Sequence, residues 1–150
     1  MTIHSNEIKI VVPGQPVPQG RPRFARRGNF VSTYDPKPSA DYKKRVKRYA
    51  SRLKLDNLLT GELEVEVLIF KETLKSFNKA KRIDAEAKLL RPITKPDADN
   101  YAKGVLDALK GIVWKDDGQV VDLIARKYYS SEPRVEIYIR ELTATQQQLF

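Results

Sequence analysis

Polar and apolar residues alternate along three segments of this chain, and the alternation restricts the folds available to it. The pattern covers residues 7–12, 62–70 and 135–140. Because successive side chains of a strand point to opposite faces, each segment predicts a strand with one apolar face. Residues 120–128 are expected to form a fourth strand. The four segments predict a mixed sheet whose strand order the pattern does not determine.

Two longer segments repeat apolar residues at helical spacing instead. We expect one main helix over residues 39–55, with Ser39 as its N-terminal cap. The second main helix is expected to run from Asp97 or Asp99 to Gly111, where glycine favours a stop.

The remaining segments predict no further domain. Residues 78–90 indicate a short basic helix inside an insertion, residues 71–91, that we expect to be mobile without DNA. Residues 143–150 are polar and are expected to form a loose tail. The predicted fold class is α+β, with the mixed four-stranded sheet packed on two main helices in one domain, residues 1–150.

The chain contains no cysteine and a single histidine, His4. This composition excludes disulfides, thiol nucleophiles and zinc sites built from cysteines or several histidines, so carboxylates would have to hold any catalytic metal. No apolar run approaches the roughly 20 residues that span a bilayer, and no signal peptide is visible. We therefore expect a cytoplasmic protein that does not use a membrane.

The formal charge of +9 is concentrated in one part of the sequence. Between residues 20 and 54, twelve basic residues are opposed only by Asp35 and Asp41. Such a surface attracts polyanions, most often nucleic acid. The candidate DNA-binding residues are Arg21, Arg23, Arg26 and Arg27 in a loop, and Lys44, Lys47 and Arg48 on one face of the first helix.

Three aromatic residues, Phe24, Phe30 and Tyr34, lie among the arginines of that loop. Aromatic rings between arginines are suited to stacking on nucleic-acid bases. The alternative is a solvated basic loop that its aromatic residues anchor to the core.

Paired aspartates precede and follow the second helix. In an extended segment after Pro96, Asp97 and Asp99 would point to the same side. Within the helix, Asp99, Lys103 and Asp107 follow at intervals of four residues. Fixed carboxylates bind Mg²⁺ through oxygen, and a basic surface collects polyphosphate. The combination suggests a metal-dependent nuclease.

Each of these acidic features also has a purely structural interpretation. Asp97 or Asp99 could cap the helix, and Asp99, Lys103 and Asp107 could form an exposed ladder of ion pairs. Residues 116–118 resemble an ordinary turn. The nuclease interpretation depends on the features occurring together.

The same residues resemble the RusA-type Holliday junction resolvases. The resemblance is densest from Lys95 to Lys127 and extends weakly to the early arginine-rich loop. Its motifs read Pro96-Asp97-x-Asp99-Asn100-x-x-Lys103, Asp107-Ala108-Leu109 and Trp114-x-Asp116-Asp117-x-Gln119-Val120.

The resemblance implies roles for particular residues. Asp97, Asp99 and Asp117 would bind the metal, and Lys103 would be the catalytic lysine. Lys127 matches a lysine on the family's next strand and is assigned to DNA binding. Alternation along a strand lets only one of Asp116 and Asp117 face the site, and structural roles are assigned to Asp107, Trp114 and Gln119.

The resemblance further implies a Mg²⁺-dependent endodeoxyribonuclease, with Mn²⁺ as a substitute, that resolves four-way DNA junctions in recombination and repair. Two opposed nicks in a substrate of approximate two-fold symmetry call for a homodimer. A phage or prophage is a plausible setting. The alternatives are a basic nucleic-acid-binding protein without activity, and a nuclease acting on flaps and other branched DNA.

Overall fold

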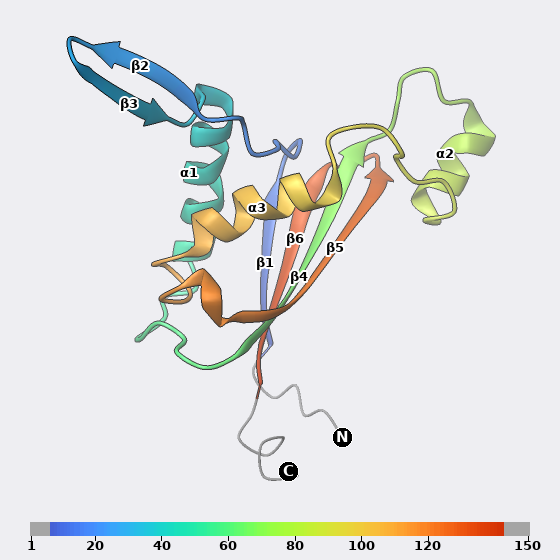
Figure 1. Cartoon of the computed structure of the whole chain (residues 1–150). Helices are drawn as coiled ribbons and strands as arrows, with labels where there is room; N and C mark the ends of the chain where they lie inside the picture. Colours follow the sequence, from blue (N-terminus) through green and yellow to red (C-terminus); the bar gives the residue numbers. More distant parts are fainter. Residues whose placement is uncertain (1–6, 143–150) are drawn as a thin grey trace.

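The computed structural model describes residues 7–142, and its centre is one mixed four-stranded sheet (Figure 1). The strands are β1 (Glu7–Pro13), β4 (Leu63–Glu72), β5 (Val120–Ser130) and β6 (Arg134–Glu141). Their order across the sheet is β1-β6-β4-β5, with β4 and β5 parallel and the other pairs antiparallel. The predicted mixed sheet is confirmed, and β5 is one of its edges.

Two helices, α1 (Lys37–Ser51) and α3 (Ala98–Leu109), pack against one face of the sheet. The apolar positions of β4 and β6 meet the buried stripes of both helices, and Leu63, Val65, Val105, Ile137 and Ile139 are fully or almost fully enclosed. The opposite face carries the stacked rings of Phe70 and Tyr128 near one end and charged residues near the other. There the Arg140 guanidinium hydrogen-bonds to Glu7 at 2.7 Å and to Glu66 at 3.1 Å. The α+β prediction with two main helices is therefore confirmed.

The segment expected to be a loop contains a β-hairpin. Strands β2 (Arg23–Arg27) and β3 (Phe30–Tyr34) pair antiparallel and project away from the body of the molecule (Figure 1). Gly28 turns the chain between them with a φ of 60°, a conformation that glycine adopts without strain. The prediction of a loop was wrong. The two strands bury no apolar face, so no alternation of apolar and polar residues marks them in the sequence.

A second projection, the α2 arm (residues 73–97), extends on the other side of the molecule (Figure 1). Helix α2 (Lys79–Glu86) is capped at its N-terminus by Asn78, whose side chain accepts from the Lys81 backbone at 2.9 Å. Helix α2 is shorter than predicted, because it ends before Lys88, whose φ is 65°. Only Ala85 of this helix is buried. The predicted mobility of residues 71–91 stays a prediction.

The boundaries of the main helices differ from those expected. Ser39 is not the cap of α1, which begins after Pro36; its hydroxyl donates instead to the Asp35 carboxylate at 2.5 Å. Helix α1 ends at Ser51, and Lys54 has a φ of 50°. Helix α3 ends at Leu109, two residues before Gly111. His4 and the predicted tail lie outside the described residues.

None of the helices within residues 7–142 has the length and apolar character required to cross a membrane.

Candidate active site

The paired aspartates flank the start of α3. Asp97 occupies the N-cap position with an extended backbone, but its side chain makes no capping hydrogen bond. The capping alternative is therefore wrong for Asp97. Within residues 7–142, no donor hydrogen-bonds to the carboxylate of Asp97 or Asp99, and both residues are exposed. These two carboxylates are available to a ligand from solvent.

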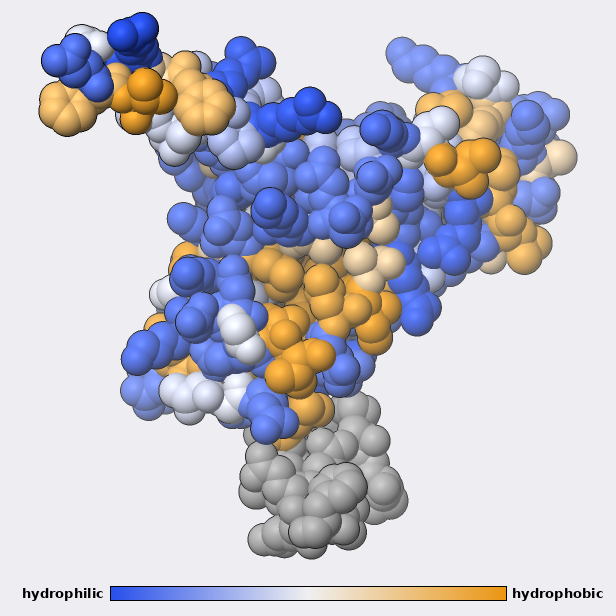
Figure 2. Space-filling model, in the orientation of Figure 1, coloured by the Kyte–Doolittle hydropathy of each residue, from blue (hydrophilic) through white to orange (hydrophobic). Residues whose placement is uncertain are grey.

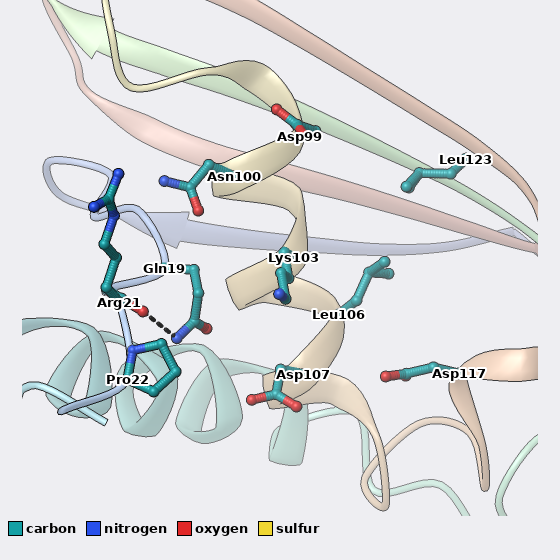
Figure 3. Close-up of a pocket in the computed structure, with 11 residues that line it drawn as sticks. Gln19, Arg21, Pro22, Asp99, Asn100, Lys103, Leu106, Asp107, Asp117 and Leu123 are labelled. Atoms are coloured by element: carbon teal, nitrogen blue, oxygen red, sulfur yellow. Dashed lines mark hydrogen bonds between the residues drawn. The ribbon is translucent and has the colours of Figure 1, made fainter. Parts of the chain in front are cut away.

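Two adjoining hollows contain the predicted catalytic residues. Figure 3 shows the first, in which Asp99 and Lys103 of α3 share a pocket with Asp117, and Arg21 lies on its other side. The second is lined by Asp97 and Asp99, with Lys103 and Arg21 again present. Asp99, Lys103 and Arg21 thus border both hollows, while Asp97 and Asp117 border one each.

The position of Asp117 is set by a buried tryptophan. The Trp114 indole nitrogen donates to Asp117 Oδ1 at 2.8 Å, and the Trp114 side chain has no solvent exposure. Asp117 begins a short 3-10 helix, η1 (Asp117–Gln119), just before β5. One carboxylate oxygen is held by the protein, and the Asp117 side chain points toward the hollow (Figure 3).

The neighbouring Asp116 and Gln119 form the cap of η1. The Asp116 side chain accepts from the Gly118 backbone, and Gln119 Oε1 accepts from the Asp116 backbone at 2.8 Å. Gln119 Nε2 donates to the Leu59 carbonyl at 2.8 Å. The structural roles predicted for Trp114 and Gln119 are confirmed, and Asp116 has a structural role as well.

The ladder of ion pairs along α3, the structural alternative for these residues, does not form. Within the described part of the chain, Lys103 makes no ion pair with Asp99 or Asp107. Asp107 instead contacts Lys43 of α1 at 2.7 Å, and the same ammonium group lies 2.9 Å from Asp35. The structural role predicted for Asp107 is confirmed, with a partner that the sequence did not indicate.

We call Asp35, Lys43 and Asp107 the clamp, because they join the end of β3 to α1 and α3. Burial favours a neutral Lys43, but the hydrogen bonds and charges of the two aspartates outweigh it and raise the Lys43 pKa. Burial also opposes ionisation of Asp35, yet hydrogen bonds from Ser39 and Lys43 lower its pKa. Both partners of the Asp35–Lys43 pair are therefore charged at neutral pH.

The loop before α3 is held by Lys127 of β5. Its ammonium group donates to the carbonyls of Thr94 at 2.8 Å and Pro96 at 3.0 Å. Arg91 in turn donates to the Lys127 carbonyl at 2.9 Å. Lys127 therefore contacts the backbone next to Asp97, and its predicted contact with DNA stays a prediction.

The other candidate DNA-binding residues lie on the outside of the molecule. Arg23, Arg26 and Arg27 are exposed on the hairpin, and Arg21 is at its foot beside the two hollows. A separate group consists of Lys44, Lys47 and Arg48, which are exposed on α1 and line neither hollow. The structure thus brings Arg21 to the catalytic candidates and leaves the α1 group apart.

The three predicted metal ligands do not form one closed group. Among residues 7–142, no three histidine, aspartate or glutamate side chains are arranged to hold a metal ion. The donor chemistry fits a hard divalent cation, because every candidate ligand is a carboxylate oxygen. Mg²⁺ is commonly bound by one or two carboxylates together with water and substrate phosphate, and the Asp97–Asp99 pair fits that description.

Comparison with known proteins identifies the family of this chain. The sequence profile of the family described as "Endodeoxyribonuclease RusA" matches residues 13–140, a span that contains every candidate site residue. A relative from Bacillus subtilis (strain 168), the uncharacterized protein YqaN, is 48% identical over 139 residues, which is 91% of this chain and 98% of that protein. This chain therefore belongs to the RusA endodeoxyribonuclease family.

Proposed function

We propose that this chain is a Mg²⁺-dependent endodeoxyribonuclease that resolves four-way DNA junctions by paired, symmetrical nicks. Membership of the RusA family indicates endodeoxyribonuclease activity on branched DNA, in a family that generally depends on a divalent metal. The observation that best supports the proposal is that Asp99, Lys103 and Arg21 line both hollows. Carboxylates for a cation and two basic groups for a phosphate meet there.

Lys103 and Arg21 are the groups that would act on the DNA backbone. Arg21 offers a planar set of donors that matches phosphate oxygens, and it is positioned to hold the phosphate beside the hollows. Lys103 makes no ion pair within the described residues, so its charge is available to stabilise negative charge as the phosphorus–oxygen bond breaks. In-line attack by water would leave a 5′-phosphate and a 3′-hydroxyl.

Asp97, Asp99 and Asp117 are the residues that would hold the metal. When bound, Mg²⁺ supplies charge neutralisation and lowers the pKa of a coordinated water. Trp114 would orient Asp117 through its hydrogen bond, and Lys127 would fix the loop that presents Asp97. Mn²⁺ would substitute, because it prefers the same oxygen donors.

We further propose that the active enzyme is a homodimer. Resolution of a four-way junction requires two opposed nicks, and one candidate site per chain meets that need only in a two-fold arrangement. Two chains with a formal charge of +9 each would bind DNA with strong salt dependence.

The test uses an end-labelled four-way junction, a flap and a linear duplex of matched sequence, each with Mg²⁺, Mn²⁺ or EDTA. Asp97→Asn and Lys103→Met are compared with Asp56→Asn, which removes an exposed carboxylate outside both hollows. We expect paired nicks in the junction from wild type and Asp56→Asn, and none from the other two variants. Equal cleavage of all three DNAs would contradict junction selectivity, and binding without cleavage would contradict catalysis.

A further inference from the structure

The β2–β3 hairpin exposes apolar rings on a surface that is otherwise basic. Phe24 is 72% exposed, Phe30 is 80% exposed and Tyr34 is 49% exposed. Figure 2 shows hydrophobic side chains on the projecting hairpin, next to strongly hydrophilic ones. Exposed rings do not stabilise the fold by burial, so exposed aromatic clusters of this kind mark binding surfaces.

The strand register divides the hairpin into two different faces. Arg27 pairs with Phe30, and Arg23 pairs with Tyr34, so these four side chains lie on one face. Between the two rings lie Ala25 and Ser32, which are also paired with each other. The opposite face carries Phe24, Thr33, Arg26 and Val31.

The first face forms a hollow. Its lining consists of Ala25, Arg27, Phe30, Ser32 and Tyr34. Phe30 and Tyr34 are four residues apart in β3, so their positions are separated by about 13 Å along the strand. Small residues form the floor between the rings, and Arg27 stands at one side. The hollow offers flat apolar surfaces with a positive charge nearby, which is the combination that stacks on bases and holds the adjoining phosphate.

The foot of the hairpin is fixed to the helix that carries Lys103. The Gln19 backbone donates to the Asn100 carbonyl at 3.3 Å, and the clamp joins Asp35 to Asp107 through Lys43. DNA held by the hairpin would therefore lie at a defined position relative to α3.

The close approach of the two hairpin ends adds to this restraint. A Cβ at Gly20 would lie 2.9 Å from both the Pro36 ring and the Ser39 hydroxyl, so the chain entering the hairpin packs directly against the chain leaving it. Arg21, between this contact and β2, borders both catalytic hollows. A phosphate at those hollows and a base at the hairpin would belong to the same bound DNA.

We propose that Phe30 and Tyr34 distinguish branched from linear DNA by stacking on bases that lose a stacking neighbour at the branch point. In a continuous duplex every base face is covered, so the two rings find no partner there. At a branch point the helical stack is interrupted and base faces become accessible. Arg23 and Arg27 bind the flanking phosphates and contribute equally to branched and linear DNA. The inference rests on the proposed function for its substrate, but it concerns binding and needs no cleavage.

The test compares the two faces of the hairpin. Phe30→Ala/Tyr34→Ala is matched with Phe24→Ala/Val31→Ala, which removes exposed apolar groups from the opposite face. Binding to a four-way junction and to a linear duplex is measured in EDTA, so that the result does not depend on catalysis. A second readout is the fluorescence of 2-aminopurine placed in the junction at the branch point.

We expect Phe30→Ala/Tyr34→Ala to weaken junction binding at least tenfold, since stacking on each ring is worth about 1–3 kcal/mol, and to leave duplex binding within about twofold. The fluorescence change on binding should disappear in this variant and persist in the matched one. Equal losses from both faces, or equal losses on junction and duplex, would overturn the proposal. A change from dimer to monomer in sedimentation, with junction preference retained, would overturn it too, because the rings would then contact a second copy of the chain.

Discussion

Removing the charge of Lys43 tests whether the clamp stabilises the fold. Lys43 contacts Asp35 at 2.9 Å and Asp107 at 2.7 Å, and its side chain is only 14% exposed. At an effective dielectric constant of about 20, each contact has a gross attraction of at least about 4 kcal/mol, most of which the desolvation of the ammonium group offsets. The net contribution is therefore much smaller than the sum of the two attractions.

The two contacts differ in exposure, so they contribute differently. Asp107 is more than half exposed, and an ion pair of that kind contributes below about 1 kcal/mol. The Asp35 contact is more enclosed, and a hydrogen bond to a charged group there contributes about 1.5–3 kcal/mol. We expect Lys43→Met to lower the free energy of unfolding by about 2–3 kcal/mol, which corresponds to roughly 4–12 °C in Tm for a chain of this size.

Lys37→Met is the matched control on the same helix. Lys37 contacts Asp41 at 3.0 Å, but its side chain is 85% exposed, so its loss should change the free energy of unfolding by less than about 0.5 kcal/mol. Urea unfolding of wild type and both variants at pH 7 measures the difference. Equal effects of the two substitutions would refute the reasoning that enclosure makes the clamp strong.

The pH dependence supplies a second check. The lowered pKa of Asp35 means that its contribution is complete at neutral pH and is lost as the pH falls below 3.8 and through the folded-state pKa. The raised pKa of Lys43 means that its contribution is complete below pH 10.5 and is lost as the pH rises through the folded-state value. The stability difference between wild type and Lys43→Met should therefore shrink in strong acid and in strong base.

Three further substitutions test single contacts at the candidate active site and on the hairpin. Trp114→Phe removes the donor to Asp117. We expect the single-turnover rate of cleavage to fall by about tenfold or more, while junction binding in EDTA stays within about twofold of wild type. Lys127→Met leaves the Thr94 carbonyl without its donor, and we expect the free energy of unfolding to fall by about 1–2 kcal/mol. If Lys127 also contacts phosphate, as the sequence predicts, the salt dependence of binding should become shallower, and an unchanged slope would contradict that contact. Arg27→Ala should reduce the salt slope of duplex binding by about 0.9, measured as binding against salt concentration.

The parts of the fold that the sequence predicted are those determined by local pattern. Strands β4 and β6 bury one face, so their apolar residues recur at every second position and reveal the strands directly. The β2–β3 hairpin buries neither face, so only the turn at Gly28-Asn29 marks it. Strand order could not be predicted, because the parallel pairing of β4 with β5 depends on the long connection through α2 and α3.

The candidate site divides in the same way. The spacing of Asp97, Asp99 and Lys103 along one short segment could be recognised from the sequence. The partner of Asp107 could not, because Lys43 is 64 residues away and is one of many lysines in a basic segment. Arg21 was a candidate for DNA binding, but its place beside both hollows depends on the packing of the hairpin foot against α3.

The aspartates around α3 differ in how their charge is balanced, and this difference leads to a last prediction. Asp107 is paired with Lys43, whereas Asp97 and Asp99 have no donor within residues 7–142 and face the hollow where a phosphate would lie. Without a cation, two such carboxylates repel the DNA backbone.

Asp99→Asn should therefore bind the junction about two- to threefold more tightly than wild type in EDTA. Removing one carboxylate charge at about 6–7 Å from a phosphate, in a site open to water, changes the binding free energy by roughly 0.6 kcal/mol. In Mg²⁺ or Ca²⁺ the advantage should vanish or reverse, because wild type then binds the cation that offsets the repulsion. Asp107→Asn is the control, because Asp107 also lines the first hollow but is paired with Lys43. Equal tightening by both variants in EDTA would show that this pairing makes no difference to the repulsion.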